Sequence, residues 1–189
     1  MEGKLFVVTG PSGAGKDSVI DKVRELGLEF GSITTTSTRP MRPGESEGNP
    51  YHFISQDEFE EKIENGEMLE WAEVYGYHYG STREEVEEQR RKNPIVIIKV
   101  DPQGARTFKE MVPDAITIFI KPPSFEFLEK RLINRASDSP EVIAKRLQTA
   151  KTELQNLESW DYQILNDEGK LEEAARELIG IVKSNNAGE

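Results

Sequence analysis

Residues 10–18 read GPSGAGKDS, and this stretch decides the fold that the rest of the chain must complete. It follows the apolar run LFVV at residues 5–8 and opens a segment whose apolar side chains recur at helical spacing. A strand, a glycine-rich loop and a helix in this order are the context of a phosphate-binding P-loop. The glycines let consecutive backbone N–H groups turn toward phosphate oxygens, and Lys16 adds a positive charge where the helix begins.

The stretch departs from the strict P-loop pattern at one position. In that pattern Ser or Thr follows the lysine directly and holds Mg²⁺, whereas here Asp17 follows the lysine and Ser18 comes next. The spacing GKx[ST] also occurs among nucleotide kinases, so a phosphate site is still predicted. We expect Asp17 or Ser18 to contact Mg²⁺, which phosphates and water otherwise hold. A glycine-rich turn that binds nothing is the alternative.

The composition excludes several classes of protein. The chain has 189 residues, a net charge of −11, no cysteine and two histidines. An acidic chain is not expected to coat nucleic acid or a membrane surface, and a chain without cysteine has no disulfides, thiol catalysis or thiolate zinc sites. No run approaches the ~18 apolar residues of a membrane-spanning helix, and the first apolar run is too short for a signal peptide. We therefore expect a cytoplasmic, single-domain protein in which an anionic ligand needs a locally basic pocket.

The order of the expected elements predicts an α/β fold, a parallel sheet with helices on both faces. Continuous apolar runs at 95–100 and 115–120 are typical of strands buried on two faces. The predicted core strands are 4–9, 95–100, 115–120 and 162–165, and the predicted core helices are 15–26, 102–111, 124–134, 141–158 and 171–183. Trp71 and Trp160 are expected in the core.

Residues 35–93 interrupt this alternation with a composition of their own, which predicts an inserted mixed α+β lobe. Its expected elements are a strand at 32–38, a loop at 39–50, helices at 56–65 and 82–92, and a hairpin at 68–81. The predicted division of the chain is a core segment with the P-loop at 1–34, the inserted lobe at 35–93, core at 94–130, a lid at 131–146 and core at 147–189.

A second candidate site begins at the stretch TTSTRPMRPGE, residues 35–45. Arg39 and Arg42 stand three apart in a Pro- and Gly-rich loop, and guanidinium forks bind phosphate oxygens in pairs. A solvated basic turn is the alternative. Further on, Glu70 lies in an apolar stretch, either as a surface residue of a strand or as a planar acceptor for N–H donors.

Three arginines, Arg131, Arg135 and Arg146, form a third cluster. Arg131 and Arg135 are four residues apart and share one face of the predicted helix. A polar stretch at 136–141 links that helix to the next. Taken alone, the cluster is most simply a set of surface arginines that pair with the abundant acids.

Together these motifs resemble the guanylate kinase family. The hydroxyl-rich strand, TRPMRPGE at 38–45, the Gly48, Tyr51 and Phe53 element, Leu-Glu-Trp at 69–71 and Tyr-Gly-Ser at 79–81 occur in the order and spacing of that family. The resemblance runs from the P-loop to Asn166 and Asp167. It implies a P-loop kinase core with an inserted NMP-binding lobe and a short helical lid.

The resemblance implies ATP-dependent phosphorylation of GMP, and of dGMP, to the diphosphate. It implies that Glu70 reads the guanine base, that Ser81 contacts the base edge, and that Asp101 lies by the amino group. A carboxylate acceptor matches the donors of guanine and would face the lone pair at N1 of adenine, so such a site discriminates strongly. The implied contacts to the GMP phosphate are Thr35, Arg39, Arg42, Tyr51 and Tyr79.

For ATP the resemblance implies contacts from the P-loop, from Arg131 and from Asn166, which matches a position near adenine. The P-loop contacts are Gly10, Ser12, Gly13, Ala14, Gly15, Lys16, Asp17 and Ser18. Catalysis is expected from charge stabilisation and alignment by Lys16, Arg42, Arg135 and Arg146. No general base is needed, because the GMP phosphate is already ionised at neutral pH.

The chain departs from the family again at Lys99, where the third core strand usually carries an acid. We hypothesise that Asp17 and Lys99 compensate for each other, either as an ion pair or with Asp17 in the outer shell of the metal. One alternative is the related kinase of ribose 1,5-bisphosphate, whose P-loop often reads GKDS. A non-catalytic guanylate-kinase-like binding module is another, and Lys16 argues against it. Monomer and homodimer both stay open.

Overall fold

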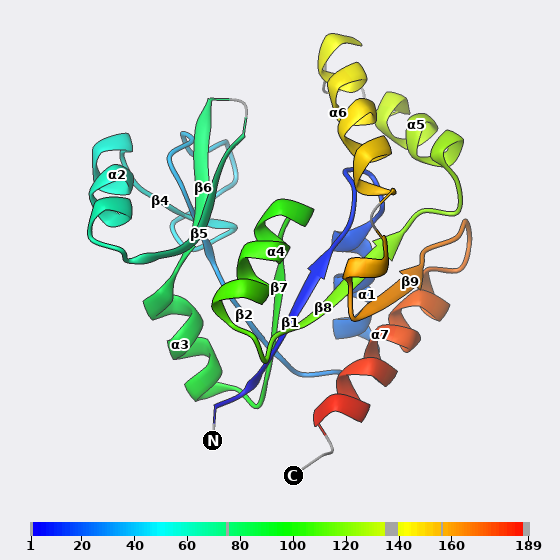
Figure 1. Ribbon diagram of the computed structural model, residues 1–189, viewed down its shortest axis with the longest axis horizontal. Coiled ribbons are helices and arrows are strands. Elements are labelled where there is room, and N and C mark those ends of the chain that lie inside the picture. Colours follow the sequence, from blue (N-terminus) through cyan, green and yellow to red (C-terminus); the bar gives the residue numbers. More distant parts are fainter. Residues whose placement is uncertain (1, 75, 135–139, 156, 187–189) are drawn as a thin grey trace.

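Five parallel strands form the central sheet of the computed structural model, which describes residues 2–74, 76–134, 140–155 and 157–186 (Figure 1). Their order is β2-β7-β1-β8-β9, and each neighbouring pair is parallel. The strands are β1 (Lys4–Thr9), β2 (Gly31–Ser32), β7 (Ile95–Lys99), β8 (Ile116–Lys121) and β9 (Tyr162–Leu165). The predicted parallel core is confirmed. Because β1 lies in the middle, its P-loop emerges at the centre of the carboxyl edge, where ligands of such sheets bind.

Side chains of β1 alternate between two apolar clusters on the two faces of this sheet. Phe6 and Val8 pack with α1 (Lys16–Glu25) and α7 (Leu171–Asn186). Leu5 and Val7 pack with α4 (Pro102–Met111) and α3 (Arg83–Lys92) on the other face. Strands covered on both faces need apolar side chains at successive positions, which explains the uninterrupted apolar runs in the sequence.

A second sheet, with four strands, stands beside the central one and contains parallel and antiparallel pairs (Figure 1). Its order is β4-β3-β6-β5, formed by β3 (Thr35–Ser37), β4 (Tyr51–Phe53), β5 (Met68–Val74) and β6 (Tyr77–Thr82). The predicted hairpin at 68–81 is confirmed as the antiparallel pair of β5 and β6. Between β4 and β5, α2 (Gln56–Glu64) begins with a capping box formed by Ser55 and Glu58.

Two helices, α5 (Phe125–Asn134) and α6 (Pro140–Glu153), rise from the same edge of the central sheet (Figure 1). They pack through a small cluster that includes Leu128, Leu132 and Ala150. The predicted helix at 141–158 is too long, because α6 ends at Glu153 and a short 3₁₀ helix follows at Leu157–Ser159. Leu154 and Leu157 pack into the apolar cluster that contains α4. The apolar spacing in the sequence therefore extends beyond Glu153, where the helix ends.

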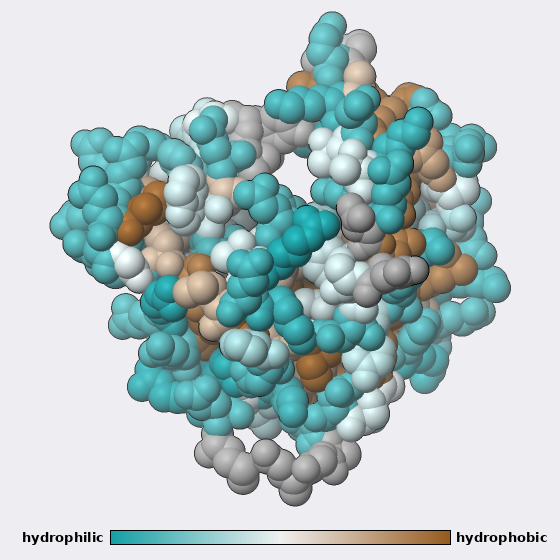
Figure 2. Space-filling model, viewed as in Figure 1, coloured by the Kyte–Doolittle hydropathy of each residue, from teal (hydrophilic) through white to brown (hydrophobic). Residues whose placement is uncertain are grey.

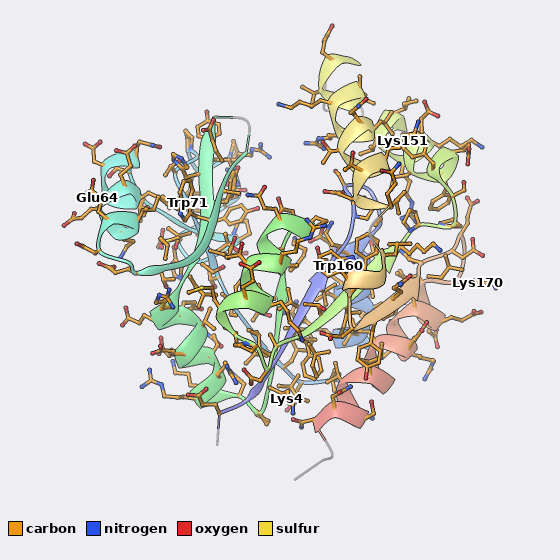
Figure 3. All side chains as sticks on the ribbon, viewed as in Figure 1. Lys4, Glu64, Trp71, Lys151, Trp160 and Lys170 are labelled. Atoms are coloured by element: carbon orange, nitrogen blue, oxygen red, sulfur yellow. The ribbon has the colours of Figure 1, made fainter. Side chains whose placement is uncertain are left out.

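The two tryptophans differ in burial, and one expectation was wrong. Trp160 is 7% exposed and stacks on Phe119, whereas Trp71 is 44% exposed. Figure 3 labels both, Trp71 on the mixed sheet and Trp160 beside the central one. Side chains of a strand point alternately to opposite faces, so burial of Glu70 in β5 directs Trp71 outward.

The longest helix in the described part of the chain is α7, with 16 residues. None of the described helices is long and apolar enough to cross a membrane.

Candidate active site

The P-loop between β1 and α1 requires glycine at two positions. Gly10 has a φ of 140°, and a Cβ atom there would lie 2.4 Å from the carbonyl oxygen of Ile120. Gly15 has a φ of 89°, and its Cβ would lie 2.4 Å from Nδ2 of Asn166. Residues with a side chain rarely adopt these angles, so backbone geometry and close neighbours both dictate the loop sequence.

Two side chains from distant parts of the chain support this loop. Asn166 is 1% exposed, and its Nδ2 donates a 2.8 Å hydrogen bond to the carbonyl oxygen of Ala14. Nη1 of Arg131 donates to the carbonyl oxygen of Gly13 at 3.3 Å. Both bonds use carbonyl oxygens, so they stabilise the loop without occupying the N–H groups that a phosphate needs.

Lys16 folds back over the loop. Its Nζ donates to the carbonyl oxygens of Gly10 at 2.5 Å and of Pro11 at 3.1 Å. Burial lowers the pKa of this ammonium to about 8, and the nearby carboxylates of Glu153 and Asp17 oppose the shift. The group is therefore mainly cationic at neutral pH, and its low-dielectric surroundings strengthen its attraction to a phosphate.

Two cavities open at this edge of the central sheet. The larger, about 860 Å³, is lined by the P-loop, and the smaller, about 380 Å³, adjoins the mixed sheet. Both volumes are in the range of small-molecule sites. The cavities share Asp17, Lys99, Val100 and Asp101, so they meet at the end of β7. Figure 2 shows the molecule hollowed between the side of the mixed sheet and the side of α6.

The larger cavity gathers most of the residues predicted for ATP. Its lining includes Gly10, Ser12, Gly13, Gly15, Lys16, Asp17, Ser18, Arg131 and Arg146. Ala14 and Asn166 are buried behind this lining. Arg135 lies outside the residues that the structure describes. Cationic groups from the P-loop, α5 and α6 converge on this cavity, an arrangement that attracts a polyphosphate.

Sequence reasoning missed several residues of this cavity: Glu73, Lys145, Thr149 and Glu153. Burial raises the pKa of Glu153 to about 7 against the opposing charge of Lys16. Three residues of the lining, Arg146, Thr149 and Glu153, are spaced i, i+3 and i+7 and so share one face of α6. Once Arg146 is assigned to the site, this helical spacing also predicts that Thr149 and Glu153 lie there.

Five of the residues predicted for GMP line the smaller cavity: Thr35, Tyr51, Glu70 and Tyr79 from the mixed sheet, and Asp101 at the start of α4. The rings of Tyr51 and Tyr79 meet edge to face, with centroids 5.6 Å apart. Asp101 caps α4, because its Oδ1 accepts from the backbone N–H of Gly104 at 2.7 Å. Hydroxyl and carboxylate groups thus surround one space at the junction of the two sheets.

Glu70 is the buried carboxylate of this cavity, with a side chain only 6% exposed. Its Oε1 accepts a 3.0 Å hydrogen bond from the hydroxyl of Ser81, which is itself fully buried. Burial raises the pKa of Glu70 to about 7, partly offset by the Ser81 bond and increased by nearby Asp101. Gly104 leaves space for this group, since a Cβ atom there would lie 3.0 Å from Oε2 of Glu70. The surface-strand alternative for Glu70 is therefore wrong.

The loop arginines differ in their surroundings. Arg39 is 7% exposed and forms a bidentate ion pair with Glu45, at 2.8 and 2.7 Å, with the rings of Tyr51 and Phe53 beside it. This ion pair, together with the N–H of Arg42, lowers the pKa of Glu45 to about 2. Arg42 itself is exposed. Arg39 is thus positioned beside the cavity, whereas a solvated turn describes only Arg42.

The two residues that depart from the family pattern meet. Nζ of Lys99 forms an ion pair with Oδ1 of Asp17 at the boundary of the two cavities. The ion pair that one form of the compensation hypothesis predicts is therefore present, and compensation itself stays a prediction.

The side chains at this boundary could hold a Mg²⁺ ion only together with the phosphates of a bound ligand. Among the described residues, no group of three or more acidic or histidine side chains is arranged to hold a metal ion. The oxygen donors of Asp17 and Ser18 line the P-loop cavity, and Mg²⁺ is commonly held by one or two such groups together with substrate phosphates. The residues fit a cation that arrives with a polyphosphate.

Comparisons with known proteins agree on one family. The sequence profile described as "Guanylate kinase" matches residues 2–185. A guanylate kinase from Nostoc sp. is 44% identical over 181 residues, which cover 96% of this chain and 89% of that protein. One from Vibrio parahaemolyticus is 46% identical over 169 residues, covering 88% and 82%. The crystal structure of guanylate kinase from Anaplasma phagocytophilum superposes with a TM-score of 0.76 at 32% identity, over 98% of this chain and 87% of that one.

Proposed function

The chain belongs to the guanylate kinase family, and we propose that its two joined cavities hold the ATP and the GMP of the reaction that this family performs. It is a phosphotransferase that converts GMP to GDP at the expense of ATP. The similarity covers nearly the whole chain, so it favours neither a ribose 1,5-bisphosphate kinase nor a non-catalytic binding module. We extend the proposal to dGMP as a second acceptor.

The observation that supports the placement of GMP is the buried carboxylate of Glu70 in the smaller cavity. A buried carboxylate is costly unless it accepts hydrogen bonds, and Ser81 supplies one of them. We assign the remaining acceptor capacity to N1–H and the 2-amino group of guanine, with Asp101 beside the amino group. Adenine lacks these donors and would leave the carboxylate buried and unpaired.

We assign the GMP phosphate to the side of the cavity formed by β3, β4 and β6. Hydroxyl groups of Thr35, Tyr51 and Tyr79 line it, and Arg39 lies against the ring of Tyr51. Because Arg39 is held by Glu45 through two hydrogen bonds, its guanidinium is fixed in place before a ligand arrives. Exposed Arg42 is assigned to the same phosphate after the loop moves toward it.

The larger cavity is assigned to ATP, with the phosphates on the P-loop N–H groups and Lys16. Arg131 and Arg146 line the same space, and we include Arg135 and Asn166 in the ATP site. Bound Mg²⁺, held by the phosphates with Asp17 or Ser18, would neutralise charge on them.

Phosphoryl transfer between the cavities needs alignment and charge stabilisation rather than a protein base. An oxygen of the GMP phosphate is already ionised at neutral pH and can attack the γ-phosphorus in line. Lys16 and Arg146 already line the cavity, whereas Arg42 must approach it. Water must be excluded from the junction, so we propose that an inserted lobe at 35–93 and a lid at 131–146 close over the core segments 1–34, 94–130 and 147–189.

A coupled assay of ADP release tests the function, using ATP–Mg²⁺ with GMP, dGMP, AMP, dTMP or ribose 1,5-bisphosphate as acceptor. The expected result is turnover with GMP and dGMP and none with the other three. Turnover with ribose 1,5-bisphosphate alone would replace the proposal by that activity. A chain that binds ATP but uses no acceptor would be a binding module.

A further inference from the structure

Lys99 occupies the boundary between the two cavities. It is the last residue of β7 and pairs in register with Val8 of β1, the strand that leads into the P-loop. The backbone N–H of Val100 donates to the carbonyl oxygen of Val8 at 3.2 Å. Both cavities include Lys99 in their lining. Two rigid strands therefore place one ammonium group where two bound substrates would meet.

The ion pair with Asp17 holds Lys99 only weakly. The side chains of Lys99 and Asp17 are 41% and 64% exposed, and ion pairs between side chains this exposed contribute little to stability. A phosphoryl group in transfer spreads its negative charge over three equatorial oxygens, each of which can accept a hydrogen bond from an ammonium group. Such a group can take the ammonium from Asp17 at little cost.

The charge balance at the boundary favours this exchange. Asp17 and Asp101 already stand there, and two anionic phosphates must approach each other between them. Lys16 contributes a positive charge from the P-loop and Arg146 contributes one from α6. Lys99 adds one from β7, and it lies near enough to Lys16 to lower the pKa of that group, although burial is the larger cause.

We propose that Lys99 is a further catalytic residue, whose ammonium leaves Asp17 when both substrates are bound and contacts the phosphoryl group in transfer. The bond between the γ-phosphorus and the leaving oxygen of ADP breaks while a bond to an oxygen of the GMP phosphate forms. Lys99 keeps its proton throughout and donates hydrogen bonds to the equatorial oxygens. This inference rests on the proposed function.

The test replaces Lys99 by methionine, which keeps the length of the side chain and removes its charge. We expect Lys99→Met to lower kcat about a hundredfold, the lower end of the loss caused by removing one donor to a transition state, and Lys99→Arg to recover part of it. Lys62→Met is the matched control. It removes a lysine of similar exposure from an ion pair with Glu67, outside both cavities, and should keep the wild-type kcat.

A binding measurement separates contact with the phosphoryl group from support of the P-loop. With GMP bound at saturation, Lys99→Met should weaken binding of the β,γ-imido analogue of ATP several-fold and leave ADP binding within twofold. In an Asp17→Asn background the loss of kcat caused by Lys99→Met should persist.

Three outcomes would overturn the inference. These are a wild-type kcat for Lys99→Met, an equal loss of affinity for ADP and for the ATP analogue, or no effect of Lys99→Met once Asp17 is Asn. Failure of the proposed function looks different, because the wild-type chain itself would then release no ADP with GMP.

Discussion

The hydroxyl of Ser81 donates a 3.0 Å hydrogen bond to Oε1 of Glu70, and both side chains are buried where β5 and β6 pair. The two residues are direct partners in the strand register, so the hairpin itself aligns them. The bond occupies one oxygen of the carboxylate and fixes the plane of the group. The other oxygen lies beside Gly104 in α4, a helix that packs against β5 of the mixed sheet and against β1 and β8 of the central one.

Glu70→Gln should lower kcat/KM for GMP by about a hundredfold or more, because an amide nitrogen would face the N–H donors of guanine. The KM for ATP should change little, since Glu70 lines only the smaller of the two cavities described. Steady-state kinetics with each substrate varied would measure both. Glu87→Gln, on the exposed side of α3, is the control, and wild-type use of GMP by Glu70→Gln would disprove the assignment of the base.

Binding of GMP should weaken as the pH falls through about 7. Burial raises the pKa of Glu70 to about 7 in the free protein, and only the ionised carboxylate accepts both guanine donors. Protons therefore compete with GMP below this pH. Calorimetric titration of GMP between pH 5.5 and about 8.5 would show the trend. The variant Glu70→Gln should keep only the pH dependence of affinity that ionisation of the GMP phosphate causes. If GMP affinity depended on pH identically in both proteins, the prediction would be contradicted.

Glu70→Gln should also stabilise the free protein at about pH 8. The pKa of Glu70 is higher in the folded protein than the ordinary glutamate value of 4.5, so the folded state binds more protons between these two values. The contribution of Glu70 to the free energy of unfolding is then greatest below about pH 4.5 and is lost as the pH rises to about 7. The shift corresponds to roughly 3 kcal/mol. Urea unfolding at two pH values would measure it, and a variant less stable than wild type at the higher pH would refute this account.

Gly15→Ala should destabilise the protein by about 1–3 kcal/mol and abolish tight ATP binding. The methyl group would meet Nδ2 of Asn166 at 2.4 Å and Nη1 of Arg131 at 2.9 Å, at a φ of 89°. Gly180→Ala is the matched control, because that glycine lies within α7 with nothing within 4 Å of the added carbon. Alanine there should stabilise the helix by up to about 1 kcal/mol. Thermal melting with and without ATP would compare the two variants.

The fold was largely predictable because its signals are local. Apolar runs at 95–100 and 115–120 fill both faces of a parallel sheet, and the glycines of the P-loop mark a backbone that other residues cannot adopt. The end of α6 was not predictable in this way. Leu154 and Leu157 continue the apolar stripe but pack beside Trp160, and periodicity does not reveal a change of partner.

The site residues that belong to a sequence motif could be predicted. The residues whose role depends on burial in the folded protein were harder to predict. Glu70 could have been a surface residue by its sequence, and alternation along β5 alone does not say which side faces the cavity. Glu153 belongs to no sequence motif, and it lies near Lys16 only because α6 packs close to the P-loop in the folded protein. Trp71 was misassigned for the same reason, since its hydrophobicity does not report that it points to the face of β5 opposite the buried Glu70.

The sequence by itself determined the P-loop, the parallel core and the set of polar groups available for two anionic substrates, because these depend on residues close together along the chain. Only the tertiary structure decided that Lys99 reaches Asp17, that Ser81 and Glu70 share a buried hydrogen bond, and that the two cavities meet at the end of β7. The physical reason is that charge pairing, desolvation and pKa depend on which strands and helices become neighbours. Strand order and register set those neighbours across long gaps in the sequence, such as the 82 residues between Asp17 and Lys99.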